Sequence, residues 1–435
     1  MDRSQRDNCG MLQLNDLPTD LLEEIFLRFV AQSQDHPSSP PSKSNFLSPE
    51  SPLFLSKICK QWRDISLGFG RLWTHLHVVD PQDVAIVQHL EEWMNRTGSI
   101  PLCLSFREDL QYDREASAAV LWLFLNSLHR CRAFEMDVKI GLEHYGLERL
   151  ERASFTSLET VRVSWDGVED DNSVILASFL LNTSSLRTIQ WSGGMRPLDA
   201  VSHTWENLRH LEIDHVTCPV GLFDAFSHCQ NLECLKLHVF LTNDHDYDSR
   251  FITLPRLTQL SILLGPRHTE TLNQLTLPSL EELKLVLAYI QLAWDPVRDL
   301  IRRSGVTLRK FSICVASELS CMDSVELVQI LKMSEFQELR VLRVEEPIVG
   351  ADIVKFLTLP SRSDPGVADG DEGSAGYLVH LESIYLVFGY IGMIQTVQGL
   401  RELIKSRLGI LLEPKLKEYV EMREHIYFSL SISPS

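Results

Sequence analysis

The stretch LRHLEIDHVTCPVGLFDAFSHCQNLECLKL, residues 208–237, contains the pattern on which the fold prediction rests. It begins with LRHLEI and ends with LECLKL, and both hexapeptides have the form L-x-x-L-x-L. The last apolar positions of each hexapeptide alternate with polar residues, as expected for a strand with one buried face. VGLFDAFSHC, between them, has the apolar spacing of a short helix. The stretch therefore predicts a strand, a helix and a second strand.

The same motif, with conservative exchanges, recurs along most of the chain. It reads LETVRV at 158, LRTIQW at 186, LRHLEI at 208, LECLKL at 232, LTQLSI at 257, LEELKL at 280, LRKFSI at 308, LRVLRV at 339 and LESIYL at 381. CRAFEM at 131 and PLCLSF at 101 fit as earlier members, and helical patterning occurs between the motifs in SVILASFLLN, DPVRDLIRRS, SVELVQILKM and ADIVKFLTL. Successive parallel strands require such crossovers, which are nearly always right-handed. The sequence therefore predicts an α/β fold, a leucine-rich-repeat-like solenoid over residues 131–435.

The array is irregular. Successive motifs begin 22 residues apart at 186 and 208 but 42 residues apart at 339 and 381. The insertion SRSDPGVADGDEGSAGY (361–377) is acidic and rich in glycine, so we expect it to be disordered. The segment from 394 to 425 is expected to form a closing helix and strand. These features predict an irregular arc with longer loops in the later repeats.

The first eighty residues follow a different, helical pattern. NDLPTDLLEEIF (15–26) has a proline in its first turn and an apolar stripe, and SPLFLSKICKQWRDISLGFGRLW (51–73) predicts a second amphipathic helix. The Ser- and Pro-rich insert over residues 31–52 should be a flexible loop. Two short helices rarely form an independent domain, so their apolar stripes need a partner. One possibility is that they cap the following domain.

A more specific reading comes from the order of the motifs. LNDLPTDLLEEIFLRF, LFLSKICKQWRDIS and RLWTHLHV together resemble the F-box motif, and especially the expanded F-box families of mushroom-type fungi. This resemblance implies that residues 12–78 form a small helical unit that docks on a Skp-type adaptor, which in turn binds a cullin scaffold of a ubiquitin ligase. The adaptor-binding residues that it implies are Leu14, Leu17, Pro18, Ile25, Phe26, Leu55, Ile58, Cys59 and Trp62. Some of these residues must instead pack the unit together, and the sequence does not sort them.

The domain prediction follows from these two parts. Residues 1–11 form a disordered N-terminus, 12–78 the F-box-like unit, 79–130 linking helices and first strands, and 131–435 the repeats. A solenoid binds ligands on its concave strand surface, where polar residues between the apolar positions point. These candidate target-binding residues are Arg162, Gln190, His210, Glu212, Asp214, Lys236, His238, Lys284, Arg343, Glu345 and Tyr385. Their charges are mixed, and they contain no arginine cluster of the kind that reads phosphorylated segments.

Composition and motifs exclude several classes of function. The net charge of −18, without a Lys/Arg cluster, argues against nucleic-acid binding. Nine scattered cysteines without a C-x-x-C pair indicate reduced thiols, and no secretory signal or membrane span is recognisable, so we expect a soluble cytoplasmic or nuclear protein. Nucleotide-binding, hydrolase and zinc motifs are missing. Asp244, Asp246 and Asp248 alternate as in a calcium loop but lack its glycine and final glutamate, so neither metal nor cofactor is expected.

The sequence therefore favours a non-catalytic substrate-recognition subunit of a Skp–cullin–F-box type ubiquitin ligase. The F-box-like unit would bind the adaptor, and the repeats would bind a target protein. Ubiquitin transfer would then depend on proximity, which raises effective concentration without a catalytic side chain in this chain. A repeat-protein interaction scaffold without a ligase role is the alternative. An enzyme with an unrecognised site is a third reading, against which the missing motifs argue.

Overall fold

The computed structural model divides the chain into two compact units, Met1–Leu186 and Arg187–Ser435, which we describe separately. The boundary between them falls inside the expected repeat region. The residues that the structure describes are 17–31, 44–109, 112–139, 141–150, 155–165, 171–193, 202–217, 222–240, 251–264, 269–287, 294–315, 324–345, 351–358, 378, 380–389, 403 and 425–431. Leu14, the possible calcium loop and the 361–377 insertion lie outside these ranges.

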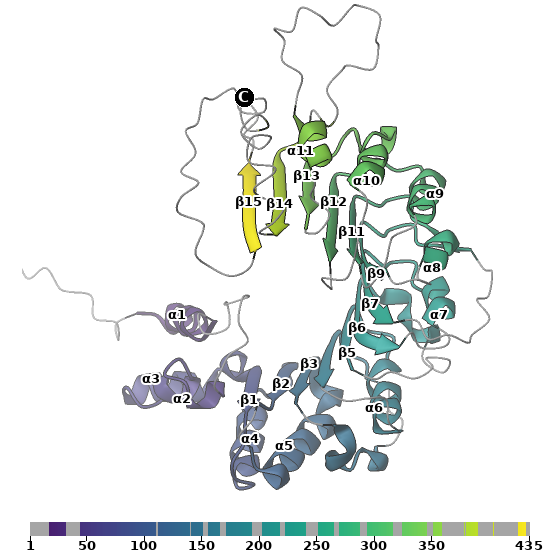
Figure 1. Ribbon diagram of the computed structural model, residues 1–435. Coiled ribbons are helices and arrows are strands. Elements are labelled where there is room, and N and C mark those ends of the chain that lie inside the picture. The colour runs from purple at the N-terminus through teal and green to yellow at the C-terminus, as the bar shows by residue number, and fades with distance from the viewer. Residues whose placement is uncertain are drawn as a thin grey trace, which may run out of the picture. The chain divides into compact units, whose positions relative to one another are not determined.

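The first unit begins with helices and continues with parallel strands (Figure 1). Its helices are α1 (Thr19–Ala31), α2 (Pro52–Leu55), α3 (Lys60–Gly68), α4 (Ile86–Asn95), α5 (Arg114–Asn126) and α6 (Asp171–Leu181), and its short 3-10 turns include η3 (Gly70–Trp73) and η5 (Leu142–Tyr145). Strands β1 (His75–Val79), β2 (Leu102–Arg107), β3 (Cys131–Val138) and β4 (Thr160–Trp165) lie side by side in that order, and all are parallel.

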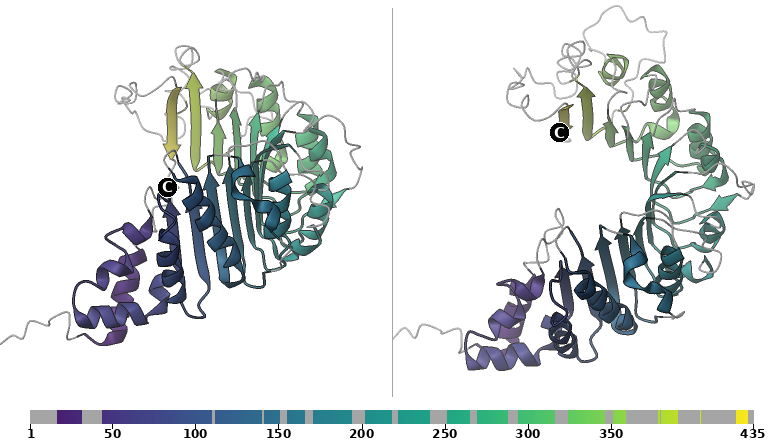
Figure 2. Two further views of the ribbon diagram at one scale, coloured as in Figure 1. Left: turned by 90° about the horizontal axis from the view of Figure 1, so that it is seen from below. Right: turned by 60° about the horizontal axis from the view of Figure 1, so that its bottom comes forward.

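The second unit repeats the alternation of strand and helix. Its parallel strands, in spatial order, are β5 (Thr188–Ser192), β6 (His210–Thr217), β7 (Cys234–Phe240), β9 (Gln259–Leu264), β11 (Glu282–Leu287), β12 (Lys310–Val315), β13 (Val341–Val344) and β14 (Ser383–Gly389). Strand β15 (His425–Ser431) pairs antiparallel with β14, and β8 (Ile252–Thr253) pairs with β10 (Leu275–Thr276). Helices α7 (Leu222–His228), α8 (Thr269–Gln274), α9 (Asp295–Ser304), α10 (Ser324–Leu331) and α11 (Ala351–Leu357) cover one face of this sheet (Figure 2).

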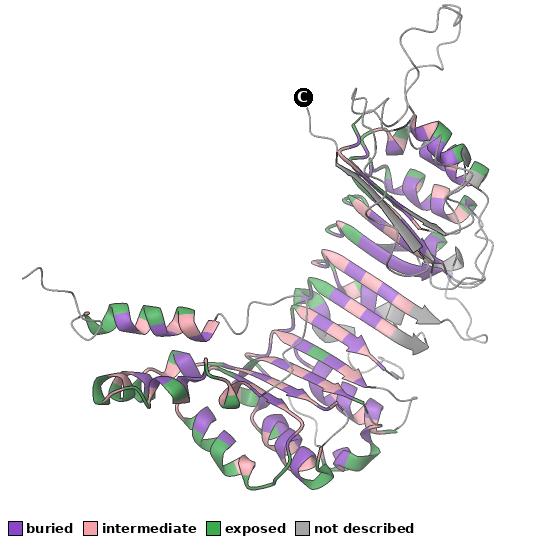
Figure 3. Ribbon diagram, turned by 60° about the vertical axis from the view of Figure 1, so that its left-hand side comes forward, coloured by how far each residue is buried: buried purple, intermediate pink, exposed green. Residues whose placement is uncertain are grey.

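The repeat motif explains this arrangement. Within β6, Leu211 and Ile213 are buried whereas Glu212 is only half-buried, as the alternation of side chains along a strand requires. The register then places equal motif positions side by side, for example Leu211 beside Leu235 of β7. The buried and half-buried stripes continue across neighbouring strands (Figure 3). The predicted strands at all the motif positions, and the predicted helices between them, are confirmed.

One predicted helix is wrong. The segment SPLFLSKICKQWRDISLG does not form a single helix but splits into α2 and α3. Ser51 and Pro52 begin α2, and the Ser51 side chain accepts a hydrogen bond from the Leu53 N–H. Cys59 has extended backbone angles (φ −153°, ψ 174°), and its Sγ accepts a hydrogen bond from the Trp62 N–H at 3.4 Å. Cys59 therefore acts as the N-cap of α3.

Two tryptophans join the helical start of the first unit to its sheet. Trp73 is fully buried, and its Nε1–H donates a hydrogen bond to the carbonyl oxygen of Ser66 in α3 at 2.8 Å. Trp93 of α4 donates from its Nε1–H to the carbonyl oxygen of Trp73 at 2.8 Å, and the two rings meet edge to face with centroids 4.7 Å apart. The Arg96 guanidinium lies 4.4 Å from the Trp73 ring centroid. Trp73 thus fixes α3 and α4 at the start of β1.

Candidate functional site

Helices α1, α2 and α3 have a core of their own. Leu22, Phe26 and Val30 form the buried stripe of α1, at intervals of four residues. The Phe26 ring packs against Trp62 of α3 with centroids 4.7 Å apart. Leu55 of α2 is 2% exposed. These side chains pack the helices together without a partner protein.

A second set of apolar side chains, on these helices and on the turns between them, is exposed to solvent. Among the described residues ten large apolar side chains are exposed, and six of them lie between residues 21 and 67. These six are Leu21, Ile25, Leu47, Phe54, Ile58 and Leu67. Leu21 and Ile58 are 52% and 50% exposed. Exposed apolar side chains scattered singly are ordinary, but a concentration on one small element marks an interaction surface.

The residues that the resemblance assigned to adaptor binding therefore divide into two groups. Pro18, Ile25 and Ile58 are exposed, and Leu17 is half-buried, so a partner can reach them. Phe26 and Leu55 are buried in the core of the helical unit, so their expected contact with an adaptor is corrected to internal packing. Cys59 and Trp62 are half-buried, and both have structural partners within the unit. Sequence reasoning missed Leu21, Leu47, Phe54 and Leu67 as candidate contacts.

In the second unit, one face of the sheet is not covered by the described helices. Strand pairing places six of the candidate target-binding residues side by side on this face, in one row across the strands. The row also contains two serines that sequence reasoning missed, and it runs Gln190, Glu212, Lys236, Ser261, Lys284, Ser312, Arg343 and Tyr385. Glu212 accepts hydrogen bonds from Gln190 at 2.9 Å and from Lys236 at 3.0 Å.

The remaining candidates lie beside this row or apart from it. Asp214 and His238 are register neighbours, each two residues after the row residue of its strand, and Glu345 directly follows β13. His210 lies two residues before Glu212 on the same strand and is in register with Cys234. Arg162 belongs to the first unit, where it pairs with Glu135 of β3. The candidate set is therefore not a single site.

Asp214, His238 and Ser261 have the residue types of a catalytic triad but not its geometry. His238 Nε2 lies 3.0 Å from Ser261 Oγ, whereas His238 Nδ1 lies 3.7 Å from Asp214 Oδ1, which is too long for a hydrogen bond. Strand β9 is paired on both sides, so its backbone N–H groups around Ser261 serve the sheet instead of an oxyanion hole. The arrangement does not support acyl transfer.

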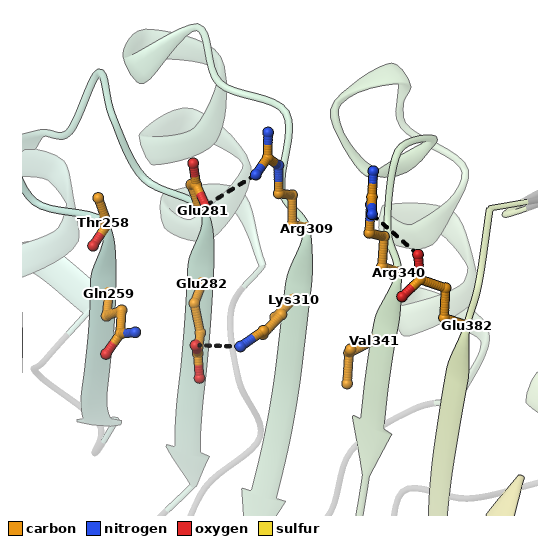
Figure 4. Close-up of a pocket in the computed structure, with 9 residues that line it drawn as sticks. All are labelled: Thr258, Gln259, Glu281, Glu282, Arg309, Lys310, Arg340, Val341 and Glu382. Carbon is orange, nitrogen blue, oxygen red and sulfur yellow. Dashed lines mark hydrogen bonds and ion pairs between the residues drawn. The ribbon is translucent and has the colours of Figure 1, made fainter. Parts of the chain in front are cut away.

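A pocket of about 270 Å³ lies where the strands of the second unit begin (Figure 4). Its charged residues form three ion pairs: Glu281 with Arg309 at 3.4 Å, Glu282 with Lys310 at 3.5 Å, and Arg340 with Glu382 at 3.1 Å. Thr258, Gln259 and Val341 complete its lining. An ionic ligand would have to break one of these pairs. The pocket is therefore compensated in charge.

Sequence reasoning missed this pocket, although the sequence contains a signal for it. The second position of each hexapeptide holds an arginine, a glutamate or, at 258, a threonine. The backbone N–H of this residue donates a hydrogen bond to the carbonyl oxygen of the second residue in the preceding hexapeptide. Arg309 donates in this way to Glu281 at 2.9 Å, and Arg340 donates to Arg309 at 2.8 Å. Opposite charges at this position, as in Arg209 and Glu233, therefore meet across neighbouring strands.

Metal and thiol chemistry find little support. Within the described ranges no group of three or more His, Cys, Asp or Glu side chains is placed to hold a metal ion. The six cysteines described there are free thiols. Burial raises the pKa of Cys131 and Cys229 to about 12, which keeps both thiols protonated and unreactive. No helix among the described residues is both long and apolar enough to cross a membrane.

Glu108 is a buried acid in the first unit, directly after β2. Glu108 is fully buried, and the hydroxyls of Tyr145 and Ser117 lie beside its carboxylate. Burial raises the pKa of Glu108; the hydroxyls of Tyr145 and Ser117 oppose this shift but do not offset it. The folded protein therefore holds this proton to higher pH than the unfolded chain does.

This acid predicts a pH dependence of stability. As pH rises from the ordinary pKa of Glu towards the raised folded value, the unfolded chain ionises first, so the free energy of unfolding falls. We expect Glu108→Gln to remove that fall and to stabilise the protein more at pH 8 than at pH 5. Denaturant unfolding followed by tryptophan fluorescence at both values measures this. The exposed Glu91→Gln is the control, and an equal effect of both variants at both pH values would contradict the prediction.

In comparisons with known proteins, no protein-family model and no curated protein matches the chain. A functional assignment must therefore be argued from the geometry of its residues.

Proposed function

We propose that this chain is a substrate-recognition subunit of a Skp–cullin–F-box type ubiquitin ligase. Residues 12–78 would be the F-box that binds the adaptor, and the repeats would form a leucine-rich-repeat-like solenoid that holds a target protein. The observation that carries the proposal is the concentration of exposed apolar side chains on α1, α2 and α3, on the turn between α2 and α3, and on the short 3-10 turn Asn45–Leu47. The order of the F-box-like motifs in the same residues supports it.

The packing of the helical unit explains why these side chains are available. Leu22, Phe26 and Leu55 already supply its core, so Leu21, Ile25 and Ile58 contribute little to that core. These side chains are 39–52% exposed, so covering them would add about half of the roughly 1.5–3 kcal/mol that full burial of such a side chain gives. A partner that covers them recovers this free energy.

The second unit supports the target-binding half of the proposal. The face opposite its helices presents a polar row across successive strands, and every side chain of this row except the buried Ser261 is exposed or half-buried. A ligase receptor needs no catalytic residue, because holding the target near a charged enzyme raises the effective concentration of the reacting groups.

A pull-down with a purified Skp-type adaptor tests the adaptor half. We expect full-length protein to bind, and the double variant Leu21→Glu with Ile58→Glu to bind roughly 100- to 1,000-fold more weakly, because two anchors are lost at about 2 kcal/mol each. Both positions are exposed, so the variant should fold, which circular dichroism checks. Phe251→Ser is the matched control, since Phe251 is 73% exposed but lies in the second unit.

The outcomes separate this function from its alternative. Retained binding in the double variant would show that another surface holds the adaptor. A wild-type chain that fails to bind the adaptor would sink the ligase proposal. The chain would then be a repeat-protein interaction scaffold whose apolar helical surface meets a different partner.

A further inference from the structure

The middle of the polar row has a regular order of charges. Reading across β7, β9, β11, β12 and β13, the residues in register are Lys236, Ser261, Lys284, Ser312 and Arg343. Cations therefore alternate with hydroxyls over five neighbouring strands. Because parallel strands lie about 4.8 Å apart, each serine is one strand spacing from Lys284. All five residues occupy the fifth position of their hexapeptides, although they lie far apart along the chain.

The three cations differ in their partners. Lys236 Nζ lies 3.0 Å from Glu212 Oε2, and Arg343 lies 2.6 Å from Glu345 Oε1. The ammonium of Lys284 has no ion-pair or hydrogen-bond partner among the described residues, because both of its register neighbours are serines. Lys284 is half-buried, so a ligand can reach it from the uncovered face. The row thus has one uncompensated positive charge, with a hydroxyl on either side.

His238, which neighbours the row, does not add a second unpaired cation to it. His238 Nε2 lies 3.0 Å from Ser261 Oγ. Burial lowers the pKa of His238. The negative charges of Asp214 and Glu212 oppose this shift, whereas the positive charges of Lys284 and Lys236 add to it. The ring is therefore neutral near pH 7 and supplies no second cation.

We propose that Lys284, Ser261 and Ser312 bind one carboxylate, the side chain of an aspartate or glutamate in an extended segment of the target protein that crosses β9, β11 and β12. The inference deepens the proposed function by naming the chemistry of the target, and it rests on that function. The Lys284 ammonium supplies the charge, and the half-buried Ser312 hydroxyl donates a hydrogen bond to the carboxylate. Ser261 is buried and pairs with His238 Nε2, so its single O–H donates to the carboxylate when the His238 Nε2–H donates to Ser261 Oγ.

Charge counting selects a carboxylate over a phosphoryl group. A phosphoserine carries about −1.5 to −2 at pH 7, and a dianion over a single free cation would be under-compensated. The pocket at the strand starts offers no better anion site, because Arg309, Lys310 and Arg340 are all paired. The net charge of −18 repels a strongly acidic partner at long range. The expected target segment therefore has one acidic residue among neutral or basic neighbours.

Three bead-bound peptide libraries test the inference with the full-length chain. Each has random positions without Asp or Glu around one fixed residue: glutamate, glutamine or phosphoserine. We expect about tenfold stronger retention on the glutamate library than on the glutamine library, as a charge-assisted hydrogen bond would give. Lys284→Met should remove this preference and Ser312→Ala should reduce it. Lys355→Met, an exposed lysine on α11, is the control and should keep it.

Several results would overturn the inference. These are equal retention on the glutamate and glutamine libraries, no retention on any library, or a preference that survives in a folded Lys284→Met variant. Stronger retention on phosphoserine would replace the carboxylate with a dianion. The adaptor pull-down keeps this test separate from the proposed function, because Lys284→Met should bind the adaptor as the wild type does. The Leu21→Glu, Ile58→Glu variant should likewise keep the library preference.

Discussion

Replacing Trp73 with alanine should lower the free energy of unfolding of the first unit by about 3–5 kcal/mol, the range found for large aromatic side chains removed from a core. Trp73 is fully buried, contacts Trp93 edge to face and donates to the Ser66 carbonyl oxygen. Its loss therefore leaves a cavity and also a carbonyl without its donor. Denaturant unfolding followed by circular dichroism measures the change.

Trp73→Phe separates the two contributions. Phenylalanine retains much of the apolar volume but cannot donate to Ser66, so this variant should lose less stability than Trp73→Ala. Because Trp73 fixes α3 at the start of β1, Trp73→Ala should also weaken adaptor binding, although Trp73 itself is not exposed. An alanine variant that keeps wild-type stability would show that the surrounding side chains close the cavity, against this account.

Replacing Phe311 with alanine should destabilise the second unit by a similar amount, about 3–5 kcal/mol. Phe311 is fully buried on β12, and its ring meets Phe336 edge to face with centroids 5.2 Å apart. Its register neighbours Leu283 and Leu342 lie on the strands at either side. The cavity would therefore open between three strands and the turn that carries Phe336. The shift of the denaturant midpoint measures the loss.

Phe251→Ala is the matched control for this variant. Phe251 belongs to the same unit but is 73% exposed, so its truncation should change stability by no more than about 0.5 kcal/mol. Equal effects of the two variants would contradict the proposed core. A Phe311→Ala variant that remains folded should also keep its adaptor binding, because the helical surface lies in the other unit.

The repeat region was predictable because its signal is local and repeated. In LRHLEI and LECLKL the leucines mark the buried face and His210, Glu212 and Lys236 the other face, and the structure follows this alternation. The helices between the motifs were predictable for the same reason. Side chains alternate between the two faces of a strand, so applying this alternation to each motif predicts the uncovered face and most of its candidate residues.

The helical start was less predictable, because periodicity leaves two neighbouring stripes on α1. Leu21 and Ile25 form one stripe and Leu22 and Phe26 the other, both at a spacing of four residues. The sequence shows them as one broad apolar stripe, whereas packing against α2, α3 and η3 buries only the second. The break at Cys59 was missed as well, because its cap depends on a side-chain hydrogen bond within an amphipathic pattern.

The sequence by itself determined the kind of fold and the face on which each polar residue of the repeats lies. Only the tertiary structure decided which charges are paired. The register of equal motif positions places Glu282 beside Lys310 but serines on both sides of Lys284. The sequence does not give the distances between these side chains. An ion pair requires a nitrogen and an oxygen within about 4 Å, and only the pairing of strands distant in sequence brings them so close.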